Sequence, residues 1–544
     1  MGNPGSNSEA EKSGFSIFGK ECLSFSFLHC ASLAQSAQLI MGSYAQPAMF
    51  LAPTRCFVSA GQNSHYFRGL MVRLPLNSKI PEFAMCFSFP GCLRCSMCFS
   101  FNKTFSLAAV ILITAAFVSS SRADGRIDAS TLIAIPHGSF SGVDYTRYEA
   151  MFYGISSSGR PYRVPCQFIA PTDPHAGRGL LLFDWLVSST IATAVGQEQP
   201  DARYTMSDDF LFGLGLSYAT VRCDPAGIGQ LSPIVDTYRP WSDGLLDTST
   251  EFITSAGDEF DIVVDYVKAL RTDPVALQRL GNINLTAAFA YSASGYNLRG
   301  LLRLQMGIGL FDFSLVGGTG NGYARPAGNK IGYSFSEKAP LAGAGLEIDF
   351  QSETDVVLAG AHKTRHEEPN YRVYQFAGAA HIRNIDATEF GCADPETANP
   401  ADWTPFLRAL FVAGDKWCDG TLPPPSIWLG APNDPTIVRD AKENALVQFV
   451  GGKPVNTSAF RLPEVAVGEN QYIPYAPSYD DGSMLGLFRA IGGGFVDLTD
   501  SFTSHAAYVR DVRSNARGLQ TLGYLLKSDA DAIIQRAIVS DIGR

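Results

Sequence analysis

Two kinds of apolar pattern alternate along the chain between residues 179 and 417. Short runs rich in apolar, β-branched and aromatic residues predict strands over residues 179–187, 216–223, 282–291, 346–350 and 371–376. Longer stretches with apolar residues at helical spacing predict helices over residues 258–280, 294–306 and 403–417, and again from about residue 504. Strands that alternate with helices are typical of an α/β fold, with a mostly parallel central sheet flanked by helices.

A proline-rich segment divides the predicted sheet from the rest of the chain. Thr421-Leu-Pro-Pro-Pro425 ends the last helix of the alternating region, because proline lacks the amide that a helix needs. We therefore expect a core over residues 124–420. Residues 421–544 form what we call the C-terminal extension, and we expect it to pack on that core.

The most apolar part of the chain lies well before the first predicted strand of the core. Residues 105–118 are almost wholly apolar, follow Lys103 and precede Ser121-Arg-Ala123. This order of a basic, an apolar and a small-residue segment predicts a secretory signal peptide over residues 97–123, and hence export to the periplasm or the medium. A membrane span needs about 20 apolar residues, so we expect no stable span in the mature chain.

Residues 1–96 do not fit this interpretation, since a signal peptide begins a protein. They contain scattered serine, phenylalanine and cysteine with little periodicity. We expect the natural start at Met97 or Met85. Residues 1–96 are then a non-native or disordered extension.

The net charge and the motifs of the sequence limit which classes of partner and cofactor we expect. The 544 residues carry a formal net charge of −10, whereas nucleic acids and anionic membranes are bound by basic surfaces, so neither is an expected partner. Cys92 and Cys95 form one CxxC pair, but no second pair, nearby histidine or HExxH motif completes a zinc-type ligand set. We expect neither a metal nor an organic cofactor.

The cysteines after residue 123 are few and even in number. They are Cys166, Cys223, Cys392 and Cys418. An even number in an oxidising compartment permits disulfides, and the pairs Cys166–Cys223 and Cys392–Cys418 each lie in one neighbourhood of the chain. Buried thiols are the open alternative.

The segment Ala290-Tyr-Ser-Ala-Ser-Gly295 lies where a predicted strand runs directly into a helix. A serine in such a turn is forced into a strained backbone conformation that exposes its hydroxyl, and the next amide can stabilise an oxyanion. We predict Ser292 as the nucleophile and the Ala293 amide as an oxyanion donor. The usual motif in this turn is Gly-x-Ser-x-Gly, and Ala290 and Ser294 stand at its two glycine positions. Ser294 is the alternative nucleophile, although Tyr296 would then occupy a position that needs a small residue.

A serine nucleophile needs a base, and the base needs a carboxylate. His381 lies in a small-residue loop after the predicted strand 371–376, and Asp355 follows the strand 346–350. The order serine, acid, histidine is that of the α/β-hydrolase triad. Glu353 is the alternative acid. The second oxyanion amide should come from the loop after strand 179–187, with Val187 as the candidate.

These residues resemble a known family, the bacterial exported proteins called alpha/beta hydrolase domain-containing proteins. The resemblance is carried by Asp184-Trp-Leu, the Tyr-Ser-Ala-Ser-Gly turn, Ser352-Glu-Thr-Asp-Val356, Tyr371 to His381, Asp415-Lys-Trp417 and Ser504 to Val509. It implies an α/β-hydrolase fold and a triad of Ser292, Asp355 and His381.

Three positions depart from the pattern of that family. Relatives usually have Gly at Ala290, Gln at Ala293 and Asn at Val187. Ala290 remains small, and Ala293 retains its backbone amide. Valine lacks the amide side chain of asparagine, so the side-chain contacts of relatives near the oxyanion loop do not carry over to Val187.

The expected reaction is cleavage of a small-molecule carboxylic ester through an acyl-enzyme. Alcohols leave more readily than amines, and the preference for esters otherwise rests on analogy at the level of the fold. Lactone opening, acyl transfer and peptide cleavage use the same site and remain alternatives. A non-catalytic binding protein on a hydrolase scaffold is a further alternative, which the replaced glycines favour.

Overall fold

The structure is a computed structural model, and it describes residues 82–88, 96–102, 125–186, 202–223, 257–326, 331–335, 340, 343–383, 396–481 and 484–544. The chain divides into two compact units, the larger of which includes residues 100–544. Strands β1 (Glu82–Ser88) and β2 (Ser96–Asn102) form a two-stranded sheet of their own. The apolar part of the expected signal peptide lies outside the described residues.

A parallel group of strands forms the centre of the main sheet. These strands are β7 (Leu180–Asp184), β8 (Ser217–Val221), β9 (Leu285–Tyr291), β10 (Phe313–Gly317), β13 (Leu346–Ser352), β14 (Tyr371–Phe376) and β15 (Ile427–Trp428). They pair in the order β8-β7-β9-β10-β13-β14-β15, and every pair is parallel. The carboxyl ends of these strands therefore meet at one edge, where α/β sheets bind their ligands.

Antiparallel strands extend the sheet on both sides, to 13 strands among the described residues. On one side lie β3 (Arg126–Ile127), β4 (Ile133–Phe140), β5 (Val143–Ile155) and β6 (Pro161–Pro171). On the other side lie β16 (Val447–Val450) and β17 (Lys453–Thr457). Two small antiparallel sheets pair β11 (Gly322–Pro326) with β12 (Ile331–Phe335) and β18 (Asn470–Ile473) with β19 (Gly494–Asp497).

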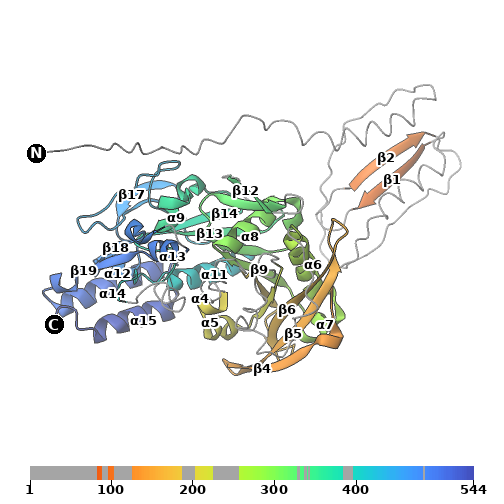
Figure 1. Cartoon of the computed structure of the whole chain (residues 1–544), viewed down its shortest axis with the longest axis horizontal. Helices are drawn as coiled ribbons and strands as arrows, with labels where there is room; N and C mark the ends of the chain where they lie inside the picture. Colours follow the sequence, from red (N-terminus) through yellow and green to blue (C-terminus); the bar gives the residue numbers. More distant parts are fainter. Residues whose placement is uncertain are drawn as a thin grey trace, which may run out of the picture. The chain divides into compact units, whose positions relative to one another are not determined.

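Helices cover the sheet (Figure 1). Those before residue 420 are α4 (Ala202–Met206), α5 (Asp208–Gly213), α6 (Glu259–Thr272), α7 (Pro274–Leu280), α8 (Ala293–Arg303), α9 (Glu353–Leu358) and α11 (Thr404–Cys418). The C-terminal extension adds α12 (Pro463–Val467), α13 (Met484–Gly492), α14 (His505–Thr521) and α15 (Lys527–Val539). Figure 1 shows α14 and α15 side by side near the C-terminus.

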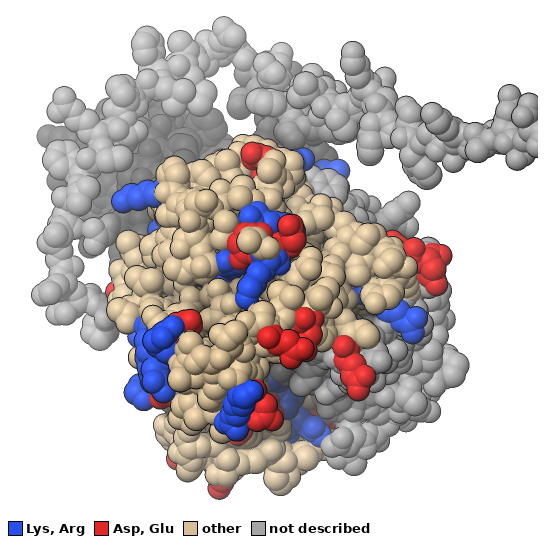
Figure 2. Space-filling view, turned by 90° about the vertical axis from the view of Figure 1, so that its left-hand side faces the viewer, with Lys and Arg blue, Asp and Glu red and all other residues tan. Residues whose placement is uncertain are grey.

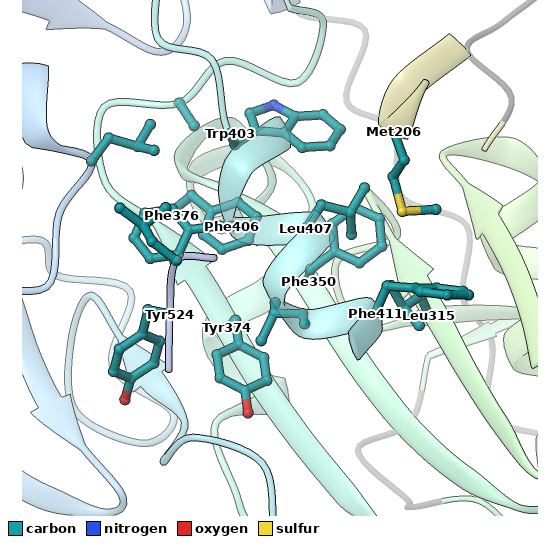
Figure 3. Packing of buried hydrophobic residues seen from close by; sticks show 14 of the residues in the cluster. Met206, Leu315, Phe350, Tyr374, Phe376, Trp403, Phe406, Leu407, Phe411 and Tyr524 are labelled. Carbon is teal, nitrogen blue, oxygen red and sulfur yellow. The ribbon is translucent and has the colours of Figure 1, made fainter. Parts of the chain in front are cut away.

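Each face of the sheet carries its own apolar core. Along β7, Leu180 and Leu182 belong to one cluster while Leu181 and Phe183 belong to the other, because successive side chains of a strand point to opposite faces. Helices α11, α14 and α15 pack on the first face, and α6 and α8 pack on the second. Figure 3 shows the first cluster, with Phe376, Trp403 and Phe406 close to one another. β7 is buried along its whole length and is apolar up to its last residue, so the sequence pattern predicts it well.

The helix expected over residues 258–280 is two helices. Asp273 accepts a hydrogen bond from the Val275 amide and caps α7, and Pro274 occupies the first position of that helix. Proline is favoured at this position because its missing amide would have no partner there. The expectation of one continuous helix was wrong at Asp273-Pro274.

Two surface properties bear on partners. In the part of the chain that the structure describes, none of the helices combines the length and the apolar character that crossing a membrane requires. Figure 2 shows basic and acidic side chains interspersed on the face that it presents.

Candidate active site

Ser292 lies in the turn between β9 and α8, at the carboxyl edge of the parallel strands. Its φ of 57° is in the left-handed region, which costs a residue other than glycine about 1–3 kcal/mol. The Ser292 amide donates to the Gly317 carbonyl at 2.9 Å, and its carbonyl accepts from the Tyr296 amide at 3.2 Å. These backbone bonds stabilise a conformation that directs the hydroxyl away from the strand.

The turn is tight because α8 lies almost in contact with the end of β10. A Cβ added at Gly295 would lie 2.6 Å from the Gly317 carbonyl oxygen and 2.6 Å from Thr319 Cγ2. Glycine is therefore required at Gly295. Ala290 is fully buried in β9 and has enough space for its methyl group.

The hydroxyl of Ser294 forms hydrogen bonds within the turn. Its hydroxyl donates to the Tyr291 carbonyl at 3.0 Å and accepts from the Tyr291 amide at 3.2 Å. The residue is buried, and these bonds direct its oxygen toward β9. Of the two serines, Ser292 is the one with its hydroxyl beside a histidine.

The structure brings Ser292, His381 and Asp355 together in one hydrogen-bonded line. His381 Nε2 lies 3.0 Å from Ser292 Oγ, and His381 Nδ1 lies 2.7 Å from Asp355 Oδ1. Carboxylates only accept, so the pattern assigns the proton to Nδ1 and leaves Nε2 to accept from the serine hydroxyl. The other oxygen of Asp355 accepts from the Ser352 amide at 2.8 Å and the Ser352 hydroxyl at 2.7 Å.

Glu353 is turned away from the histidine ring. One of its oxygens accepts from Arg439 at 2.6 Å, and the other accepts from the Gly378 amide at 2.7 Å. Burial raises the pKa of Glu353, and the Arg439 charge opposes that shift. Of the two candidate acids, Asp355 is the one in contact with His381.

A known protein family matches most of the chain. Residues 145–535 match the family described as Alpha/beta hydrolase domain. The chain belongs to this family. None of the curated proteins matches the chain.

Solved structures resemble this alpha/beta hydrolase only in part. Prolyl oligopeptidase B from Galerina marginata is 9% identical, with a TM-score of 0.21, and the match covers 49% of this chain and 39% of that one. Brefeldin A esterase, a bacterial homologue of human hormone sensitive lipase, is 11% identical, with a TM-score of 0.18 and coverage of 39% and 47%. Oligopeptidase B from Trypanosoma brucei is 12% identical, with a TM-score of 0.18 and coverage of 37% and 29%. The chain thus spans less than half the length of these proteins.

Two residues of the alpha/beta hydrolase site were not predicted from the sequence. The Tyr291 hydroxyl donates to the His381 carbonyl at 2.5 Å, and its ring stacks on the imidazole with centroids 5.0 Å apart. Gly318 lies against both rings, since a Cβ there would be 2.9 Å from His381 Cε1 and 2.9 Å from Tyr291 Cζ. The run Gly317-Gly-Thr-Gly320 was a visible signal of close packing, but nothing in the sequence pairs Tyr291 with a residue 90 positions away.

Of the two expected oxyanion donors, Ala293 lies within the described residues. Ala293 is the first residue of α8, where amides have no partner within the helix and point toward a bound anion. Val187 lies outside the described residues. β7, the strand before it, ends at Asp184 beside β9.

The expected disulfide between Cys166 and Cys223 was wrong. Both residues are buried thiols, and Cys418 is also a thiol, while Cys392 lies outside the described residues. Cys166 is paired across the sheet with Val221 rather than Cys223. A diagonal neighbour two residues along lies about 7–8 Å away, which is beyond the reach of a disulfide.

Within the described ranges no cluster of three or more His, Cys, Asp or Glu side chains is arranged to bind a metal ion. His137 is one histidine that lies beside a carboxylate without forming such a cluster. His137 contacts Asp208 at 3.1 Å beside Arg203, which is an ion-pair arrangement.

Proposed function

We propose that this alpha/beta hydrolase is a serine hydrolase that cleaves carboxylic esters through an acyl-enzyme. Ser292 is the nucleophile, His381 the general base and Asp355 the carboxylate that orients the imidazole. The observation that carries the proposal is the pair of distances from His381, 3.0 Å to the Ser292 oxygen and 2.7 Å to Asp355.

The chemistry follows from this line of hydrogen bonds. His381 Nε2 takes the hydroxyl proton as Ser292 attacks the ester carbonyl, and Asp355 stabilises the resulting imidazolium. The Ala293 amide, with a second amide from the loop that contains Val187, stabilises the oxyanion. The proton then passes to the leaving alcohol, the acyl-enzyme remains, and His381 activates water to release the acid.

The environment of the triad favours catalysis over a binding role. A scaffold that only binds has no need of a strained serine, yet Ser292 has a φ of 57°. Strain of this kind persists where the surrounding structure maintains it for function. We further propose that residues 97–123 direct the chain to export.

The test is covalent labelling of the purified full chain with a fluorophosphonate, followed by mapping of the labelled peptide. We expect label on Ser292, complete loss in Ser292→Ala, and a loss of at least about 1,000-fold in labelling rate in His381→Ala. Ser294→Ala should retain labelling, since its hydroxyl bonds to Tyr291.

Two results would contradict the assignment. Label on Ser294 would retain the reaction class but change the nucleophile. A folded chain that takes no label would favour the binding-protein alternative. The ester preference is tested separately, by comparing turnover of 4-nitrophenyl esters with that of the matching anilides.

A further inference from the structure

Three consecutive residues of α9 contact the loop that carries His381. We call residues 377–383 the histidine loop. Asp355 bonds to the imidazole, as described above. Thr354 Oγ1 accepts from the His381 amide at 3.1 Å. Glu353 bonds the same loop twice, since its amide donates to the Ala379 carbonyl at 3.0 Å and its carboxylate accepts from the Gly378 amide at 2.7 Å.

The charge on Glu353 is balanced from the C-terminal extension. Glu353 is fully buried, and both of its oxygens accept from N–H donors, which is the bonding pattern of the ionised form. A buried carboxylate requires a partner charge, and Arg439 supplies it at 2.6 Å. Arg439 is oriented in turn by the Glu443 carbonyl at 2.8 Å.

The extension also contacts Thr354 and the histidine loop directly. The Thr354 hydroxyl donates to the Pro474 carbonyl at 2.5 Å, so its oxygen is oriented to accept from His381. The Ile491 carbonyl accepts from the amides of His381 at 3.1 Å and Ile382 at 3.4 Å. The loop therefore lies between α9 on one side and residues of the extension on the other.

We propose that Glu353 and Thr354 are positioning residues for His381, and that Arg439 and Pro474 of the C-terminal extension maintain them in place. The inference rests on the proposed function, because it concerns the same base. Proton transfer from Ser292 requires the imidazole within hydrogen-bond reach of both neighbours. A misplacement of about 1 Å can cost roughly 100-fold in rate.

The experiment measures the kinetics of fluorophosphonate labelling of the full chain, which needs no knowledge of the natural substrate. Thr354→Val removes the hydroxyl with little change of shape, and Thr354→Ser restores it. Glu353→Gln removes the charge opposite Arg439. Thr364→Val is the matched control, because Thr364 is a buried threonine that donates to a backbone carbonyl, Ala361, at 2.9 Å away from the histidine loop.

We expect Thr354→Val and Glu353→Gln to lower the maximal labelling rate about 10- to 100-fold. The probe concentration at half-maximal rate should change less than about threefold, since neither residue binds the probe. The acid limb of the pH–rate profile should move to lower pH, because a displaced imidazolium loses stabilisation by Asp355. Thr354→Ser should recover most of the rate, and Thr364→Val should retain it.

Thermal unfolding of each variant separates misplacement from loss of the fold. If Glu353→Gln does not fold, Arg439→Met tests the same ion pair from its more exposed partner. Variants that label at the wild-type rate with an unchanged pH profile would overturn the inference, and so would an equal loss in Thr364→Val. A wild-type chain that takes no label would instead overturn the proposed function, and this inference with it.

Discussion

The residues around Ser292 are small because two backbone segments nearly touch there. Gly295 of α8 faces the Gly317 carbonyl oxygen, and the space for a side chain is absent. Ala290 occupies a buried position in β9 with ordinary strand geometry, so its methyl group costs nothing there. The Ser294 hydroxyl bonds to both polar groups of the Tyr291 backbone. The departures from the Gly-x-Ser-x-Gly pattern thus lie where glycine is not needed.

Gly295→Ala should reduce both stability and fluorophosphonate labelling. The added methyl group would lie 2.6 Å from the Gly317 oxygen, so α8 must shift and carry Ser292 with it. We expect a loss of about 1–3 kcal/mol in the free energy of unfolding and at least about a tenfold loss in labelling rate. Denaturant unfolding and labelling kinetics measure the two effects.

Gly518→Ala is the matched control for that substitution. Gly518 is an exposed residue of α14, and a Cβ there would meet nothing within 4 Å. We expect it to stabilise the chain by about 0.4–1 kcal/mol, because alanine restricts the unfolded chain. Equal effects of the two substitutions would show that packing against Gly317 is not the cause.

At the scale of elements, a buried ionic cluster joins α8 to β13. Arg299 lies 2.6 Å from Asp349 and 3.3 Å from Glu347, and Arg303 lies 2.7 Å from Glu347. Burial alone would lower the pKa of Arg299, but the carboxylates of Asp349 and Glu347 raise it above its usual value. The cluster connects the helix of the nucleophile to the strand that leads to Asp355.

Arg299→Met should destabilise the chain strongly. The substitution leaves Asp349 and Glu347 with too little positive charge in a fully buried site, and it removes the 2.7 Å bond to the Gly320 carbonyl. We expect a loss of about 3–5 kcal/mol in the free energy of unfolding. Lys527→Ala, which breaks an exposed pair with Asp531, should cost less than about 1 kcal/mol. Urea unfolding of both variants checks the contrast, and a loss below 1 kcal/mol in Arg299→Met would contradict it.

The elements that could be predicted from the sequence are those with an unbroken local pattern. β14 was expected over residues 371–376 and has those bounds, because four of its six residues are aromatic or β-branched and favour a strand. Strands β3 to β6 were not predicted, since their burial alternates or is interrupted and their pairing is antiparallel. The candidate triad could be found because strand ends and chain order are local signals. The contacts of Glu353 with Arg439 could not, because 86 residues separate them.

At the scale of the molecule, the C-terminal extension is part of the same sheet and the same core. β15, β16 and β17 continue the sheet beyond β14. The Tyr374 hydroxyl of β14 donates to the Pro424 carbonyl at 2.5 Å, and the Tyr524 ring lies 6.3 Å from that of Phe406 in α11. Figure 3 shows Tyr524 and Phe406 in one cluster. The region up to residue 420 therefore buries its apolar surface only with the extension present.

A chain that ends at residue 420 should consequently fail to fold. Its truncation would expose Tyr374 and Phe406, which now pack against Tyr524 of the extension, and would remove the Ile491 carbonyl from the His381 amide. We expect loss of near-ultraviolet circular dichroism and of fluorophosphonate labelling. Co-expression of residues 421–544 as a separate chain should restore part of both, because the contacts are non-covalent. If the truncated chain gave a cooperative thermal transition and labelled on Ser292, the extension would be a separate addition to a complete catalytic unit.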